Sequence, residues 1–463
     1  MRPLTWLALL GLLPVFGCGD DEAPPLSSPV GPVVPETQRP GDPAAGYRAL
    51  INRGYVSCGM PYSAWVKVVP PRPSGIPGRE GDNANLPPQL TAFRTASGVE
   101  VVGPNCLACH SGHINGQYVI GLGNTDQDLT GDLSAYVLFA GGLVTDPVEQ
   151  TEYQKFKQRV DAIAPYVGTR TIGSNSADNL GVVLFAHRDV ATLAWSQKPL
   201  LALPPEEPVP VRVPPWWRMS KKNAMFYNAA GRGDQARIMM TASALCTDSV
   251  PAAEAIDSYF PDVRAWIVEL LPPAWPFAID SARAAQGRAV FEDTCARCHG
   301  TYGAGGSYPN LVVAVEEVGT DPMLAVDAAG FAGRFVNWFN RSFYGRIARY
   351  APARGYIAPP LDGIWAVAPY LHNGSVPTLA ALLSSSTRPR YWTRSFDSTD
   401  YDPAGVGWHF SALDHGQAEA SSEDQRKRIY DTTLPGYSNA GHPFGDGLTT
   451  DQRAAVIEYL KTL

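Results

Sequence analysis

The sequence predicts a mainly α-helical protein with two domains, each built around one copy of a short motif, and with long irregular loops. The motif is Cys-x-x-Cys-His, which occurs at 106–110 and at 295–299. Helical periodicity surrounds the second copy, over 281–300 and 448–463. The passage LPPEEPVPVRVPPWW at 203–217 is too rich in proline to form a helix and indicates a long loop.

The repeated motif points to a cofactor, because Cys-x-x-Cys-His is the attachment sequence of c-type haem. Two cysteines hold the porphyrin through thioethers, and the histidine is the first axial ligand of the iron. A structural zinc site would need four converging ligands, and a redox-active dithiol would leave both histidines without a role. We therefore expect two covalently bound haem c groups. The predicted binding residues are Cys106, Cys109, His110, Cys295, Cys298 and His299.

The second domain, predicted at 273–463, begins with a helix that places Gly287 and Phe291 on one face. Its last segment begins with Thr449 and Gln452 at the spacing of a capping box. The apolar stripe of that segment consists of Val456, Tyr459, Leu460 and Leu463. A haem-bearing helix that a terminal helix crosses near a small residue is the arrangement of cytochrome c. We therefore expect a cytochrome c-like haem domain here.

The first domain, predicted at 47–272, is divided from the second by the linker-like LLPPAWPFAID at 270–280. A helix is expected around 149–164. Its apolar side consists of Tyr153, Phe156, Val160 and Ile163. The proline-dense loop at 203–217 is long for a plain electron carrier, and such loops are often functional. We expect a second cytochrome c-like domain, elaborated by loops and a short hairpin.

The N-terminus, residues 1–17, has the features of a lipoprotein-type signal peptide: one arginine, an apolar run and the ending VFGC. Cleavage there leaves Cys18 as a lipidated first residue that anchors the chain to a membrane; ordinary signal cleavage nearby is the alternative. Residues 18–46 are rich in proline and acid and predict a disordered tether. The expected location is the periplasm or cell surface, where bacteria attach haem covalently.

Cysteine use and charge narrow the function classes. Beyond Cys18 and the haem cysteines, Cys58 and Cys246 remain, either as a disulfide in an oxidising compartment or as two buried small side chains. The chain has 37 basic and 44 acidic residues, a net charge of −7, without a basic stripe. No nucleic acid partner is therefore expected, and an acidic surface is compatible with docking a basic electron-transfer protein.

The second axial ligand of the C-terminal iron is predicted by elimination. The last methionine is Met323, and none follows in the region that crosses the far face of a cytochrome c haem. His442 lies in the glycine-rich loop before the terminal helix, where the backbone can approach closely and aim a side chain inward. His372 is the rival candidate, whereas His409 and His415 occupy a polar segment typical of the surface.

The first haem is expected to have an open axial position. His113 lies one turn from His110 and cannot reach the opposite face, so His187, Met219 and Met225 are the remaining candidate ligands. Aromatic residues would make a dry distal wall instead, and a nearby arginine or acid could polarise bound O2 or peroxide. The stretch 214–234 offers Trp216, Trp217, Phe226, Arg232 and Asp234 for these roles.

Five stretches carry a recognisable combination. They are VEVVGPNCLACH, PPWWRMSKKNAMFYNAAGRGDQARIMM, PPLDGIWAVAPYLHNGSVPTLAALL, YDPAGVGW and YSNAGHPFG. The chain thereby resembles bacterial dihaem c-type cytochromes of the cytochrome c peroxidase superfamily, and most closely the dihaem rubber oxygenase-like group. The segment PYLHNG is general to the superfamily, and the combination is more specific. The resemblance extends from about residue 99 to the C-terminus.

The resemblance implies that O2 or H2O2 reacts at the N-terminal haem, held by His110, and that His299 and His442 both bind the C-terminal iron. Trp217 and Phe226 match the aromatic region beside the active haem. Two departures weaken polyisoprene as the substrate. The chain is shorter than the rubber-cleaving members, and it has a lipid-anchor signal whereas those enzymes are secreted.

We therefore expect an exported haem-dependent oxidoreductase, an oxygenase or peroxidase, in which the second haem stores or relays electrons. The predicted catalytic residues are Trp217, which would also bridge the haems, Phe226 and Arg232. One alternative is a dihaem cytochrome c peroxidase, although the chain lacks a histidine at the spacing that such enzymes use to gate the first haem. The other is a pure electron-transfer cytochrome. The sequence identifies neither an organic substrate nor a redox-partner protein, and it leaves a calcium ion open as a further cofactor.

Overall fold

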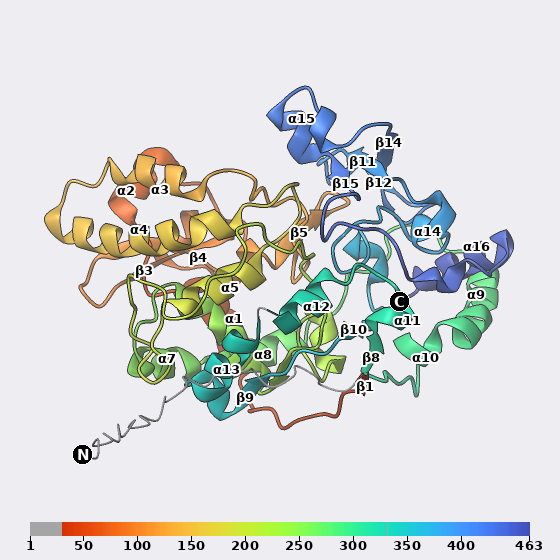
Figure 1. Cartoon of the computed structure of the whole chain (residues 1–463), viewed down its shortest axis with the longest axis horizontal. Coiled ribbons are helices and arrows are strands. Elements are labelled where there is room, and N and C mark those ends of the chain that lie inside the picture. The colour runs from red at the N-terminus through yellow and green to blue at the C-terminus, as the bar shows by residue number, and fades with distance from the viewer. Residues whose placement is uncertain (1–29, 331) are drawn as a thin grey trace, which may run out of the picture.

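A computed structural model describes residues 30–330 and 332–463 as a mixed α/β molecule (Figure 1). Helices account for 40% of the structure and strands for 14%, which corrects the expectation of a mainly α fold. The strands form small antiparallel sheets of two or three strands each. The helices therefore share the scaffold with many short hairpins.

One such hairpin shows why these strands could not be predicted from the sequence pattern. Strands β3 (Leu90–Arg94) and β4 (Glu100–Pro104) pair in register, and β2 (Met60–Pro61) adds to the free edge of β4. Gly98 in the connecting turn has a φ of +84°, which favours glycine. The adjacent valines of β4 are both buried. The strand thus lacks the apolar–polar alternation by which a half-buried strand is recognised in a sequence.

The helices of the first half include the predicted one at 149–164. It is α4 (Pro147–Val167), with Tyr153, Val160 and Ile163 buried as expected. Asp146 caps it by accepting hydrogen bonds from two backbone N–H groups. The other helices of this half are α1 (Pro43–Asn52), α2 (Tyr62–Val68), α3 (Leu133–Gly141), α5 (Ala177–Ala186), α6 (Gln235–Met239), α7 (Val250–Asp257) and α8 (Phe260–Val268).

In the second half, the terminal helix α16 (Thr450–Leu460) crosses α9 (Ser281–Thr294), as predicted. A Cβ on Gly287 would lie 1.8 Å from the carbonyl oxygen of Ala455, so only glycine allows this approach. Thr449 and Gln452 form the predicted capping box. The remaining helices are α10 (Ala296–His299), α11 (Val315–Val318), α12 (Met323–Gly330), α13 (Ala332–Arg341), α14 (Leu379–Leu382) and α15 (Glu423–Arg428).

The other sheets are equally small. One has the order β1 (Gly31–Pro32), β8 (Leu311–Ala314), β10 (Gly355–Ile357), and another the order β14 (Phe410–Leu413), β11 (Tyr391–Arg394), β15 (Tyr430–Asp431). The two-stranded pairs are β5 (Ser111–Ile114) with β6 (Gln117–Ile120), β7 (Gly231–Gly233) with β9 (Ala348–Tyr350), and β12 (Tyr401–Asp402) with β13 (Gly407–Trp408).

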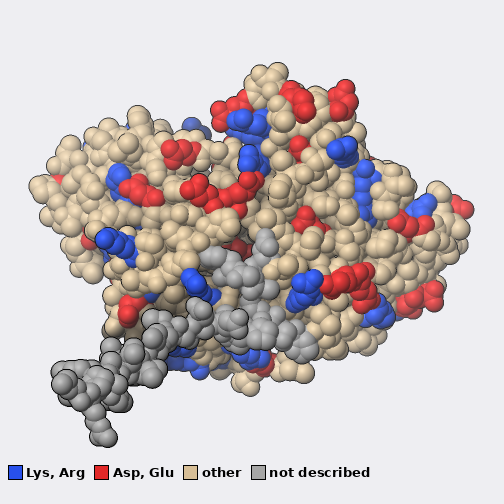
Figure 2. Space-filling view, viewed as in Figure 1, with Lys and Arg blue, Asp and Glu red and all other residues tan. Residues whose placement is uncertain are grey.

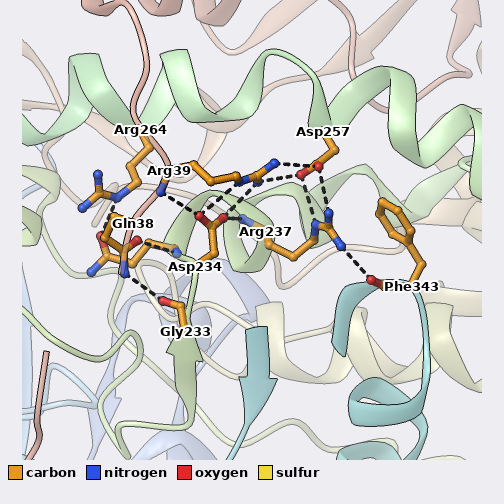
Figure 3. A network of polar contacts seen from close by, with 9 residues as sticks. Gln38, Arg39, Gly233, Asp234, Arg237, Asp257, Arg264 and Phe343 are labelled. Carbon is orange, nitrogen blue, oxygen red and sulfur yellow. Dashed lines mark hydrogen bonds and ion pairs between the residues drawn. The ribbon is translucent and has the colours of Figure 1, made fainter. Parts of the chain in front are cut away.

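Residues 30–46 are packed on the molecule, which corrects this part of the predicted tether. Strand β1 pairs with β8, and α1 begins at Pro43. Between them, Arg39 donates hydrogen bonds to Asp234 and Asp257 (Figure 3). The proline-rich composition indicated an extended chain, but it could not show that two distant carboxylates hold that chain in place. The predicted signal peptide, Cys18 and residues 19–29 lie outside the described residues.

The two halves of the sequence interlock. Strand β9 in the second half pairs with β7 in the first. Helix α13 places Phe335 and Trp338 against Phe185 of α5, with ring centroids 5.7 and 4.8 Å apart. These aromatic side chains belong to one buried cluster that draws on both halves. A boundary between residues 272 and 273 therefore separates the two haem motifs in the sequence. It does not separate the cores, because the core of the first half includes Phe335 and Trp338 from the second.

Cys58 and Cys246 form a disulfide across 188 residues, so of the two alternatives left open by the sequence the structure shows the pair. The disulfide lies within the same buried cluster. Among the helices of residues 30–330 and 332–463, none combines the length and apolar character that a bilayer crossing requires.

Candidate haem-binding sites

The first Cys-x-x-Cys-His motif follows strand β4 in a single turn of 3-10 helix, Cys106–Ala108. Asn105 caps this turn, because its side-chain oxygen accepts a hydrogen bond from the N–H of Leu107 at 2.9 Å. Leu107 is fully buried and fixes the turn in the core. Both motif cysteines carry free thiols that are partly exposed. The backbone thus holds the two sulfur atoms where a thioether partner can reach them.

His110 presents a neutral imidazole. Its ring stacks on Trp216, with centroids 4.6 Å apart and planes 20° from parallel. Burial lowers the pKa of His110 to about 4, against the opposing effect of the Pro214 carbonyl. A neutral ring nitrogen is the form that binds a metal. The indole of Trp216, and not that of Trp217, fixes the plane of this ring.

The second motif lies where α9 ends and α10 begins. Cys295 terminates α9, and Cys298 and His299 complete the following turn. The Nδ1 of His299 lies 2.8 Å from the carbonyl oxygen of Pro359. A hydrogen bond donated there fixes the tautomer and leaves Nε2 as the free metal-binding nitrogen. Burial lowers the pKa of His299, which keeps the ring neutral.

His442 lies in the loop before α16, as the sequence predicted. Its φ is +48°, and its N–H donates to the carbonyl of Val318 at 2.6 Å. A Cβ on the preceding Gly441 would lie 2.1 Å from the backbone of Gly319, so the loop depends on glycine for this close approach. Arg388 holds the loop from the other side, because its guanidinium donates to the carbonyls of Asn439, Gly441 and His442.

The rings of His299 and His442 face one another with centroids 6.2 Å apart. Two imidazole nitrogens each about 2 Å from one metal ion place their ring centroids roughly 6 Å apart. Burial also lowers the pKa of His442 to about 4, and its Nδ1 has no hydrogen-bond partner. The pair therefore fits an iron held between two neutral histidines.

The competing histidines lie elsewhere. His372 is buried against Tyr356, with ring centroids 4.3 Å apart and planes nearly parallel. His409 is exposed and bonded to Asp400, as expected for a surface residue. His415 is partly exposed beside Asp414.

The candidate second ligands of the first iron separate into two kinds. The ring of His113 packs against Tyr118, and His187 is held by the Ser196 carbonyl and by stacking on Trp195. Met219 and Met225, in contrast, pack in the cluster that contains Leu107 and Trp216. A methionine is therefore the alternative to an open position that an experiment must test.

The proline-dense loop ends in a segment that runs between the two motifs. Trp216 stacks on His110, and the Nε1 of the next residue, Trp217, donates to the carbonyl of Asp362 at 2.8 Å. Trp217 is buried in a cluster with Ile114 and Leu122 from the first half. From the second half the cluster includes Phe291, Tyr302 and Leu361. The position of Trp217 suits the predicted bridge between the haems.

Phe226 and Arg232 lie on one hairpin, in which Met225 pairs with Gly231. The Phe226 ring packs near Tyr350, at 5.7 Å between centroids. The Nε of Arg232 donates to the Ala229 carbonyl at 2.5 Å, a contact that closes the hairpin. The structure thus gives Arg232 a structural hydrogen bond, and its catalytic role stays a prediction.

Asp234 belongs to a different arrangement from the predicted distal pocket. It caps α6 and binds Arg39, whose guanidinium also binds Asp257 (Figure 3). Arg237 completes the set by donating to Asp257. This ion-pair network joins the N-terminal segment to α6 and α7, so the structure assigns Asp234 to packing.

Within residues 30–330 and 332–463, no three side chains of His, Cys, Asp or Glu converge on a common metal position. Calcium stays a prediction.

On the face in Figure 2, acidic and basic side chains are interspersed.

Comparisons with known proteins add a family-level finding. The family model for cytochrome C oxidase, cbb3-type, subunit III, matches residues 282–336, which include the second Cys-x-x-Cys-His motif. The model described as RoxA-like, cytochrome c-like, matches residues 355–393. The chain carries c-type cytochrome domains. These domains imply covalently bound haem c and a redox function. The first motif lies outside both matched ranges.

Two curated relatives of this cytochrome come from Sinorhizobium fredii. The uncharacterized protein y4iJ is 33% identical over 42% of the chain and 41% of its own length. The uncharacterized protein y4iM is 34% identical over 45% of the chain and 55% of its own length. The chain thus spans about half the length of these relatives, and their names assign no activity.

Proposed function

We propose that this chain is an exported dihaem c-type cytochrome of the rubber oxygenase-like group. It activates O2 or H2O2 at the N-terminal haem, and its C-terminal haem stores or relays electrons for an organic substrate or a redox-partner protein. The observation that carries the proposal is the asymmetry of the two sites. His442 faces His299 across the second site, whereas the histidines nearest in sequence to His110 make other contacts.

The residues of the two sites would have different roles in binding the two haems. When bound, each haem supplies an iron that exchanges electrons and that can take up O2 or H2O2 where an axial position is open. His110 would hold the first iron in an orientation fixed by the Trp216 stack. His299 and His442 would occupy both axial positions of the second iron and exclude other ligands.

Aromatic residues would connect and shield these sites. Trp217 lies in a buried cluster that includes residues of both halves, which supports its role as the bridge for electrons. Phe226 packs in the apolar surroundings of the neighbouring hairpin and would help to exclude water from the first site. Arg232 would supply positive charge from the same hairpin.

Export is supported by the disulfide. Cys58 and Cys246 are paired, and disulfides persist mainly in oxidising compartments. Lipidation at Cys18 would anchor the chain to a membrane at the periplasm or cell surface. Acyl labelling of the wild type and of a Cys18→Ser variant tests this: label that persists in the variant would refute the anchor.

The decisive experiment is carbon monoxide binding to the reduced protein, followed by turnover with O2 and with H2O2. Wild type should bind about one CO for two haems, since only the first iron offers an open position. His442→Ala should bind about twice as much and convert the second haem to a high-spin form, with haem attachment intact. The control His409→Ala removes an exposed histidine and should change neither value.

The same measurements separate the alternatives. A pure electron-transfer cytochrome would bind no CO, and Met219→Leu or Met225→Leu would then open the first site if a methionine closes it. A dihaem peroxidase would turn over with H2O2 and a reduced small cytochrome but not with O2. His110→Ala should abolish turnover and leave the second haem's spectrum unchanged; full turnover in that variant would refute the proposal.

A further inference from the structure

Two buried arginines have unpartnered hydrogen-bond donors. Arg212 is 5% exposed, and its Nε and Nη2 have no hydrogen-bond partner. Arg218 is 4% exposed; its Nε donates to the carbonyl of Asp362 at 3.0 Å, but its Nη2 has no partner. By comparison, the buried Arg188 donates to three backbone carbonyls and to Asp248. Arg212 and Arg218 therefore lack the partners that a buried guanidinium normally has.

The positive charge of Arg212 acts on Arg218. Burial, together with the positive charge of Arg212, lowers the pKa of Arg218 to about 10. Tyr227 lies within range of both arginines. The Asp362 carboxylate, which also acts on Arg218, has both oxygens bonded to Lys221. The pair thus concentrates positive charge that the neighbouring side chains do not neutralise.

Such an arrangement requires an anion. An uncompensated buried charge costs several kcal/mol, and the repulsion of a second like charge raises that cost. The planar fork of arginine matches a carboxylate, to which it donates two parallel hydrogen bonds. A carboxylate ligand would therefore satisfy both the charge and the free N–H groups.

The pair lies between the two haem motifs. Arg218 is near the second site, because it donates to the carbonyl of Asp362 at 3.0 Å, three residues beyond Pro359, whose carbonyl oxygen lies 2.8 Å from the Nδ1 of His299. Arg212 follows Val211, which pairs with Asn175, and the Asn175 amide donates to the Sγ of Cys109 at 3.4 Å. Arg212 also lines a small, partly open cavity with residues that adjoin the first motif, Thr125 and Ser174.

We propose that Arg212 and Arg218 bind haem propionate carboxylates, Arg212 those of the haem on His110 and Arg218 those of the haem on His299. This inference rests on the proposed function, because it requires a haem at each motif. The positive charges of the two arginines then influence the reduction potentials of both irons from a position between the two haems. It also fixes how the two porphyrins face each other.

Three variants test the proposal. Arg212→Met and Arg218→Met remove the charge and the donors, whereas Arg218→Lys keeps the charge and loses the fork. The control is Arg288→Met, on α9 near the second motif, where the guanidinium is exposed and paired with Glu292. The readouts are haem content, the propionate bending band in resonance Raman spectra, and the reduction potential of each haem.

Each methionine variant should lower the frequency of the propionate band, because the propionate loses hydrogen bonds. The potential of the adjacent haem should shift to more negative values, because removal of a positive charge favours the oxidised iron. Arg218→Lys should shift the band with a smaller change in potential, and it serves as the test if Arg218→Met fails to fold. Arg288→Met should leave both readouts unchanged.

An unchanged band and potential in folded Arg218→Met would overturn the proposal. So would a wild-type potential that depends on added chloride or phosphate while the band stays constant, which would identify a free anion as the ligand. The haem content of wild type tests the proposed function separately. Haem at the second motif alone would refute the dihaem proposal and the assignment of Arg212, and the Arg218 test would still stand.

Discussion

Replacing Asp257 by asparagine should destabilise the folded protein by about 3–5 kcal/mol, the cost of breaking a buried ion pair. The carboxylate accepts four hydrogen bonds, two from Arg39 at 2.7 Å and two from Arg237 at 3.0 and 2.8 Å. Asparagine keeps one acceptor oxygen and turns an NH2 group towards the guanidinium groups. Loss of two charge-assisted bonds, at roughly 1.5–3 kcal/mol each, gives a similar magnitude.

The effect should depend on pH. Burial alone would raise the pKa of Asp257, but the hydrogen bonds and charges of Arg39 and Arg237 lower it below its usual value. The unfolded chain therefore binds the proton more readily, so this contribution to stability is present above the unfolded pKa of about 3.9 and is lost as the pH falls through the lower folded value. Asparagine does not titrate, and the difference between the two proteins should shrink on acidification.

The assay is urea unfolding of the holoprotein, followed by near-UV circular dichroism at pH 7, 5 and 3.5. Glu316→Gln is the control, since its exposed pair with Arg354 should contribute little. Equal stability of Asp257→Asn and wild type at pH 7 would refute the assignment of a stabilising network. A difference that stays constant down to pH 3.5 would show that Asp257 does not carry the acid dependence.

Three further predictions concern packing and loop support. Gly287→Val should destabilise the second half by about 3 kcal/mol through overpacking at the α9–α16 crossing, whereas Gly447→Val, which meets open space, should be neutral in thermal unfolding. Arg388→Met should loosen the axial histidine loop and raise the high-spin fraction of the C-terminal haem in absorption spectra, with partial rescue by lysine. The double variant Cys58→Ala, Cys246→Ala should lose about 2–5 kcal/mol and become insensitive to added reductant in denaturant unfolding.

Local patterns in the sequence predicted several structural elements around the second motif. The capping box is a local signal, and the glycines at the helix crossing and before His442 mark positions where distant backbone comes close. Elimination of methionine added the axial candidate that the structure brings opposite His299. These features could be predicted because the residue types that each one requires are visible in a short stretch of sequence.

The surroundings of the first site depend on contacts between distant segments. Trp216 and Trp217 are adjacent in sequence, and only the fold shows that the first stacks on His110 while the second joins the other core. A sequence also does not show which buried arginines lack hydrogen-bond partners, because the partners come from several distant segments of the folded chain. The proline content of residues 30–46 predicted a disordered tether. It could not show that Arg39 binds this segment to partners about 200 positions away.

The aromatic side chains of α13 have a consequence for biogenesis. On the proposed export route the chain crosses the membrane from its N-terminus, so the first haem motif emerges before Phe335 and Trp338, which complete the core against Phe185. The core of the N-terminal half therefore stays incomplete until the chain has followed as far as Trp338. That delay gives the attachment machinery access to Cys106 and Cys109 before the core closes.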